Sequence, residues 1–203
     1  MQTSVKSSQK QFEIALEQGS RSPRFQGILS LFWGLIFAKL FILEYGMQIY
    51  DVPLNSTFYI WTLTLVMGVV CSVAYLRSGR LQLPGKPLTG QLVRSIWLGV
   101  FCAMLIATAG AVWVAELSAY LLPGIYALIL GIGLFTHSVL NGRTLFRALA
   151  GGWWAAALLL LSRDDVITFA WFSGFLLILH VLPTAWLHFR RGGSASSESN
   201  YSI

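Results

Sequence analysis

Charged side chains are scarce in this sequence. Lysine, arginine, aspartate and glutamate make up 11% of the 203 residues, whereas hydrophobic residues make up 56%. A soluble domain of ordinary composition has about 25% charged residues. The deficit excludes a water-soluble globular core and favours segments that are solvated by lipid. Because a membrane-spanning helix needs roughly 20 apolar residues, about six spans and their connectors account for the chain, and no room remains for a separate soluble domain.

Reactive and metal-binding patterns are also missing. The two cysteines, Cys71 and Cys102, fall inside apolar runs, as is typical of small buried hydrophobic side chains. No Cys-x-x-Cys motif or cysteine/histidine cluster indicates a metal or redox centre. The sequence has no GxSxG, no HExxH and no phosphate-binding glycine loop. These absences disfavour an enzyme, and the sequence predicts no cofactor and no metal.

The amino-terminal 23 residues lack the pattern of a cleaved signal peptide, because they are polar. We expect residues 1–23 to be a cytoplasmic segment with a short amphipathic helix, capped by Ser8, on the membrane surface. The first span then acts as an uncleaved signal anchor. Residues 189–203 are rich in serine and glycine and are expected to form a disordered cytoplasmic tail.

Residues 24–188 consist of apolar runs separated by short polar connectors. Proline and glycine interrupt the connectors, for example at Pro84, Gly85 and Pro87. The predicted fold class is an all-α integral membrane protein with six transmembrane helices arranged as three hairpins. The expected spans are 25–45, 56–76, 93–114, 119–140, 145–162 and 166–187.

Basic residues lie almost entirely on one side of this arrangement. Of the 14 lysines and arginines, 12 fall in the two tails or at the second and fourth connectors, Arg163 falls on the other side, and Lys39 lies within a span. This asymmetry predicts that both termini are cytoplasmic, in a bacterial cytoplasmic (inner) membrane, and it requires an even number of spans. The net charge of +6 therefore reflects topology, and a nucleic-acid partner is not expected.

Small residues recur at every fourth position in three of the predicted spans. Small side chains allow membrane helices to approach closely, so these spans are predicted to form the tightly packed centre. A helix that glides within a transporter would show the same pattern. The predicted helix-packing residues are Gly99, Ala103, Ala107 and Ala111 in 93–114, Gly131 in 119–140, and Gly152 in 145–162.

Lys39 is the sharpest polar feature, because it lies well inside the first apolar run. A charge in the hydrocarbon is costly and normally faces protein or water, or reaches the interface. Glu44 is five residues further on and does not form an i,i+4 pair with it; Glu116 is the nearest alternative partner by depth. Two interpretations remain open: a structural lysine that is paired or reaches the interface, and a functional group on a ligand or transport pathway.

His137 and His180 are the other candidate functional residues. A b-type haem needs two histidines on facing helices, and this pair is a weak candidate for that role. The alternative for His180 is an interior histidine held by a hydrogen bond. Pro183 leaves the carbonyl of Leu179 without its helical donor, and a kink there, with Ser173 nearby, predicts a polar notch.

Three stretches of the chain resemble a group of uncharacterised six-span bacterial inner-membrane proteins. They are EQGSRSPRFQGILSLFWGLIFA (17–38), YLLPGIYALILGIGLF (120–135) and WFSGFLLILHVLPTAW (171–186). The last contains a Gly-Phe…Leu-His element, formed here by Gly174, Phe175, Leu179 and His180. The group is often associated with winged-helix regulators, so the resemblance implies a regulated membrane or stress-related role. It implies no activity or binding site, and neither Lys39 nor the Trp153-Trp154 pair belongs to its pattern.

The leading functional hypothesis from sequence is a non-enzymatic accessory or regulatory membrane component. Such a component lies in the lipid bilayer, and its expected partner there is another protein or a second copy of the chain. The alternative is a small-molecule or ion transporter, or a channel, that uses Lys39 in the outer half of the bundle. A third and weaker hypothesis is an intramembrane enzyme or haem protein that uses His137 and His180.

Overall fold

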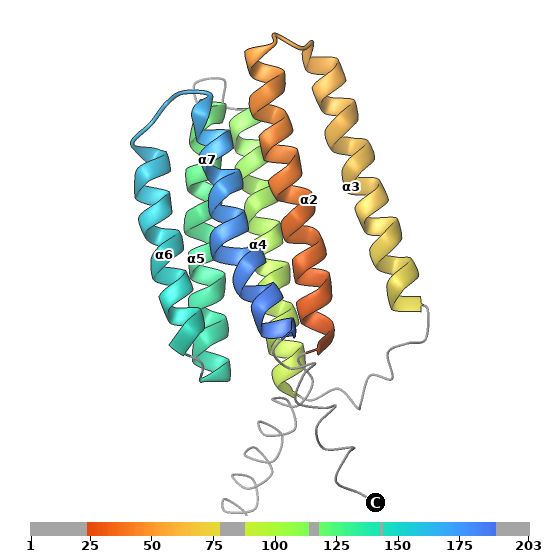
Figure 1. Ribbon diagram of the computed structural model, residues 1–203, viewed down its shortest axis with the longest axis vertical. Coiled ribbons are helices and arrows are strands. Elements are labelled where there is room, and N and C mark those ends of the chain that lie inside the picture. Colours follow the sequence, from red (N-terminus) through yellow and green to blue (C-terminus); the bar gives the residue numbers. More distant parts are fainter. Residues whose placement is uncertain (1–23, 78–87, 114–117, 143, 190–203) are drawn as a thin grey trace, which may run out of the picture.

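The computed structural model describes residues 24–77, 88–113, 118–142 and 144–189, and almost all of them are helical (Figure 1). The predicted amino-terminal helix within residues 1–23 and the carboxy-terminal tail from residue 190 onward lie outside the described residues. In the described part of the chain, six helices are long and apolar enough to cross a membrane. The predicted all-α, six-span fold class is confirmed, and the chain is a multi-pass membrane protein.

The helices follow the predicted spans closely. The elements are α2 (Arg24–Ile49), α3 (Leu54–Arg77), α4 (Leu88–Trp113), η1 (Ala119–Leu121), α5 (Leu122–Asn141), α6 (Thr144–Leu161), α7 (Ile167–Leu176) and η2 (Leu177–Val181). Helix continues after η2 over residues 182–189, so the sixth span comprises α7, η2 and this last segment. The largest departure at the start of the chain is α2, which ends four residues beyond the predicted boundary at residue 45.

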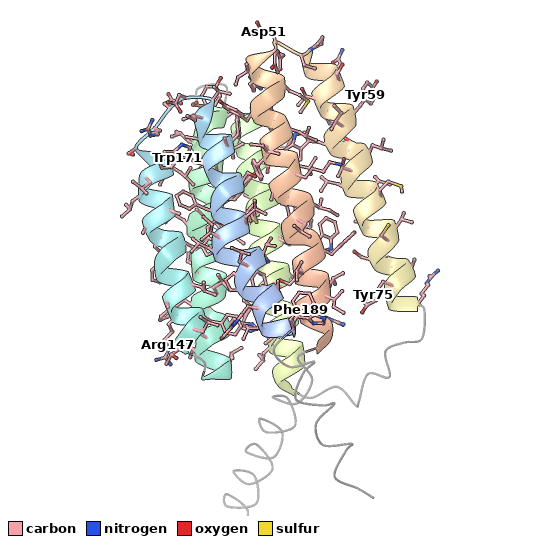
Figure 2. All side chains as sticks on the ribbon, in the orientation of Figure 1. Asp51, Tyr59, Tyr75, Arg147, Trp171 and Phe189 are labelled. Atoms are coloured by element: carbon pink, nitrogen blue, oxygen red, sulfur yellow. The ribbon has the colours of Figure 1, made fainter. Side chains whose placement is uncertain are left out.

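The two ends of the bundle differ in their side chains (Figure 2). Asp51, Tyr59 and Trp171 lie towards one end, which we call the Asp51 end. Arg147, Tyr75 and Phe189 lie towards the other, which we call the Arg147 end. Aromatic side chains concentrate at both interfaces of membrane helices, so the tyrosines and Trp171 indicate where the two interfaces lie.

Local sequence explains where the helices turn at these ends. Asp51 adopts a φ of 50° in the turn between α2 and α3, a left-handed conformation that aspartate tolerates better than most residues. Gly142, with a φ of 63°, ends α5 in the left-handed region, where glycine is the favoured residue. Pro123 lies in the first turn of α5, where its missing N–H is not needed.

Most of the buried surface belongs to α2, α5, α6 and the sixth span, whereas the spans of α3 and α4 are the least buried. Figure 1 shows α3 at the outer edge of the bundle, beside α2. The helix pair α5 and α6 makes the most extensive contact, α2 lies along α7, and α3 contacts mainly α2. The share of the span that is buried is 44% for α5 and 11% for both α3 and α4. The prediction that the third to fifth spans form the centre is therefore wrong for α4, which lies along α5 but has little of its span buried.

Glycines bring α5 and α6 close together at the Asp51 end. A Cβ atom on Gly124 would lie 2.6 Å from Cγ and 3.2 Å from the backbone nitrogen of Leu161 at the end of α6. Gly131 faces Trp154 of α6, and Gly152 of α6 faces Leu179 of η2. The predicted packing residues Gly131 and Gly152 thus both lie at close helix contacts.

Replacement of Gly124 by alanine is expected to lower the free energy of unfolding by about 1–3 kcal/mol, the usual cost of overpacking. The matched control is Gly151→Ala on α6, where a Cβ atom meets nothing within 4 Å. The control should be neutral or stabilising, because alanine favours helix over glycine by about 1 kcal/mol. Unfolding of both purified variants in mixed micelles, titrated with sodium dodecyl sulfate, measures the difference. Equal stability of the two variants would contradict the close contact.

Candidate functional site

An aromatic cluster around Phe41 of α2 occupies the half of the bundle nearer the Asp51 end. The Phe41 ring contacts Trp61 of α3 edge-on, with ring centroids 5.3 Å apart, and Phe172 of α7 at 4.6 Å. It also contacts Tyr126 of α5 and Phe169 of α7. Aromatic pairs of this geometry contribute about 0.5–1.5 kcal/mol beyond the area they bury. One side chain of α2 therefore holds three other helices together.

Glu44 lies one helical turn after Phe41 and is buried, with 8% of its surface exposed. Its Oε2 accepts a hydrogen bond of 2.7 Å from Nε1 of Trp61, and its Oε1 accepts one of 3.0 Å from Nε2 of Gln48. Buried carboxylates are costly unless they are hydrogen-bonded or paired. The Glu44–Trp61 bond offsets this cost and ties α3 to α2, so this acid has a structural role that the sequence analysis missed.

Lys39 lies on the opposite, exposed face of α2. Its neighbours on this face are Leu35, Ile42 and Leu43, whose exposed fractions are 46%, 47% and 38%. Ala38 and Phe41, on the other face, are buried. Lys39 therefore does not line the interior of the bundle. Arg163 and Asp165 form the ion pair found among the described residues. Lys39 and Glu44 are therefore not paired, as expected from their five-residue spacing. Glu116 lies outside the described residues.

His180 forms a polar contact between the sixth span and α2, nearer the Arg147 end. Its Nε2 is 3.0 Å from the hydroxyl oxygen of Ser30. His180 lies in η2, a π-helical turn in which the N–H of Leu182 bonds the carbonyl of Leu177, five residues earlier. Such a turn inserts one extra residue and re-aims side chains, and π turns are frequent at functional positions. The structure gives His180 the hydrogen-bonded interior position that one of the two sequence interpretations expected.

Gly34 of α2 makes room for the imidazole ring of His180. A Cβ atom on Gly34 would lie 2.8 Å from Cδ2 of His180 and 3.0 Å from Cγ2 of Val181. Ser173 also bonds α2, because its hydroxyl donates to the backbone carbonyl of Ala38 at 2.8 Å. The predicted polar notch near Pro183 is thus filled: the hydroxyl and the imidazole both bind α2.

The two histidine candidates have different surroundings. The ring of His137 on α5 lies 4.8 Å from the ring of Phe146 on α6 and 6.3 Å from that of Trp97 on α4. His180 contacts α2. In the described part of the chain, no three or more His, Cys, Asp and Glu side chains come together in a group that could hold a metal ion.

Gly99 and Ala103 line an apolar groove between α4 and α5, together with Gly133 and Thr136 of α5. A Cβ atom on Gly99 meets nothing within 4 Å, so this predicted packing residue makes no close helix contact. Ala107 packs against the hydrophobic core, and Ala111 is half-buried. Only part of the small-residue stripe of α4 therefore packs against the rest of the bundle.

Comparison of the chain with protein-family models, with curated proteins and with solved structures finds no match. The resemblance to six-span bacterial inner-membrane proteins therefore stays a prediction.

Replacement of Trp61 by phenylalanine is expected to lower the free energy of unfolding by about 1–3 kcal/mol, because the buried Glu44 carboxylate loses a donor. Glu44→Gln should cost less, since its amide oxygen still accepts from the indole. The control is Trp113→Phe on α4, which is 86% exposed and should leave stability unchanged. Unfolding in detergent measures all three. A Trp61→Phe variant as stable as the control would show that the bond contributes nothing.

Gly34→Ala should also be destabilising, because the new methyl group would overlap the His180 ring. The loss should shrink when His180→Ala is added, which makes the two changes non-additive by about 0.5–3 kcal/mol. A double-mutant cycle of unfolding free energies gives the coupling directly. Strictly additive losses would contradict the close approach of α2 and η2.

Proposed function

We propose that this protein is a non-enzymatic accessory or regulatory component of a bacterial cytoplasmic membrane, with both termini in the cytoplasm. The observation that carries this proposal is the closed interior. Most buried side chains of the described residues are apolar or aromatic, and the largest fully buried ones include Trp153, Phe172, Leu40 and Leu160. Among the polar side chains near the centre, His180 and Ser173 are bonded to α2.

The distribution of charge supports the proposed orientation. Arg77, Arg94 and Arg147 are exposed, and Arg147 marks the end of the bundle opposite Asp51 (Figure 2). Cytoplasmic loops of membrane proteins carry the excess of basic residues. Arg163, in the turn between α6 and α7, is engaged locally: it lies over the ring of Trp171 at 5.3 Å and pairs with Asp165.

A transporter or channel with Lys39 on its pathway has less support. Lys39 lies on the exposed face of α2, and the interior nearest to it is filled by the aromatic cluster around Phe41. An intramembrane enzyme or haem protein has less support again, because His137 and His180 make their contacts with different helices.

Reconstitution into lipid vesicles tests the proposal. Vesicles that contain the protein are expected to show the same proton, potassium and chloride flux as empty vesicles, because most buried side chains of the described residues are apolar. Dye-based flux assays measure this, and a known channel reconstituted in parallel serves as the positive control. A saturable flux that disappears in Lys39→Met would overturn the accessory role and establish the transport alternative.

A further inference from the structure

We propose that the exposed face of α2 around Lys39 docks a transmembrane helix of another membrane protein that carries an aspartate or glutamate within the bilayer. This inference rests on the accessory role proposed above and names the partner of that role by its chemistry. We call the surface the Lys39 face and define it as Leu35, Lys39, Ile42, Leu43 and Gly46.

The Lys39 face is a continuous stripe on one side of α2. Its members are spaced by three or four residues, which places them on the same side of a helix. Three of them are large exposed apolar side chains. A Cβ atom on Gly46 would meet nothing within 4 Å, so the helix backbone is open to close approach there. Small residues at such positions let a second helix come near.

Lys39 lies at a depth in the membrane where a charge has a high free-energy cost. It lies ten residues before the end of α2 at Ile49, about 15 Å along the helix axis. Tyr59 lies five residues after the start of α3, so Lys39 is about 7 Å deeper than this interfacial tyrosine. Helical side chains lean towards the amino terminus, which here points away from the Asp51 end. Extension of the ammonium group to the nearer interface therefore runs against this lean.

The described part of the chain supplies no compensating acid. Glu44 faces the interior and is bonded to Trp61 and Gln48. Asp51, Asp164 and Asp165 are exposed in turns at the Asp51 end, far from the level of Lys39, so a second copy of the chain offers no described carboxylate at the right depth. Glu116 is outside the described residues, and the experiment below treats it as the rival partner within the chain.

A carboxylate on a neighbouring helix fits this surface better than a lipid headgroup. Phosphate groups lie at the interface, whereas Lys39 is a point charge surrounded by leucine and isoleucine. An ion pair is much stronger in a low-dielectric medium than in water. A helix with one acid among apolar residues would therefore gain both the packing of the stripe and the neutralisation of Lys39.

The first test uses a designed probe: a leucine/alanine transmembrane peptide with one aspartate at mid-membrane depth, and a matched peptide with leucine there. In the full-length protein Cys71 and Cys102, which lie within spans, are replaced by alanine, and a single cysteine at Tyr50, 81% exposed at the Asp51 end, carries the label. Energy transfer to labelled peptide in lipid vesicles gives the affinity. We expect the aspartate peptide to bind at least tenfold more tightly than the leucine peptide. Lys39→Met should abolish the difference, Lys39→Arg should keep it, and the control Leu35→Met should leave it unchanged.

Four outcomes would overturn the inference. Equal binding of the two peptides, or a preference that survives Lys39→Met, would show that Lys39 does not select the acid. A several-fold gain in affinity on Glu116→Gln would show that Lys39 is already paired within the chain. A Lys39-dependent signal that requires anionic lipid and not the aspartate would assign the lysine to a headgroup.

Photo-crosslinking in cells separates this inference from the accessory role. A photoreactive residue at Ile42 is expected to capture a membrane protein whose crosslinked helix contains an acid, and Lys39→Met should remove that product. Leu158, exposed on α6, is the control position. Capture of a partner at Leu158 and not at Ile42 would refute docking at the Lys39 face, whereas the proposed accessory role would still stand. A product of twice the chain's mass at Ile42 would refute the inference in favour of a homodimer.

Discussion

The structure depends on the position of α2 between the sixth span and α3. Lipid is as apolar as a leucine side chain, so membrane helices associate through packing and hydrogen bonds and not through exclusion of water. On one side α2 bonds the sixth span, through Ser30 to His180 and through the carbonyl of Ala38 to Ser173. On the other side it bonds α3, through Trp33 to Ser72 and Glu44 to Trp61. Without α2, His180, Ser173 and Trp61 would lose these bonds in an apolar medium, where an unpaired polar group is costly.

Packing reinforces these bonds at two levels of the bundle. Phe41 joins the rings of the cluster nearer the Asp51 end, and Gly34 admits the imidazole of His180 nearer the Arg147 end. The α5–α6 hairpin forms the other half of the core, and Trp153 on α6 contacts Phe172 on α7 at a ring separation of 5.7 Å. The helix that carries Lys39 on its exposed side is thus rigidly held on its buried side, which keeps the Lys39 face in a defined orientation.

Much of the fold could be predicted from the sequence, because span length and turn residues are local properties. Gly142 and Pro123, residue types that favour helix ends, lie at the two ends of α5. The sequence did not predict which side of each helix packs against the rest of the protein, because a span that is apolar on all sides gives no sign of it. For this reason the burial of Glu44 against α3 had no signal in the sequence, and α4 was expected at the centre. The π-helical turn at His180 also had no reliable signal, although Pro183 indicated that the normal bonding pattern fails there.

The contact between α2 and the sixth span has a consequence for how the chain is assembled in the membrane. Ser30 and His180 are 150 residues apart, so the first span meets its main neighbour only after the last span has been made. At synthesis rates of about 5–20 residues per second, the interval is roughly 8–30 seconds. During this interval the face of α2 that later binds Ser173 and His180 lacks these partners and is open to chaperones, to the insertion machinery and to wrong neighbours. The α2–α3 hairpin forms early, through Trp61 and Ser72. It covers one side of α2 while the other side still lacks the sixth span.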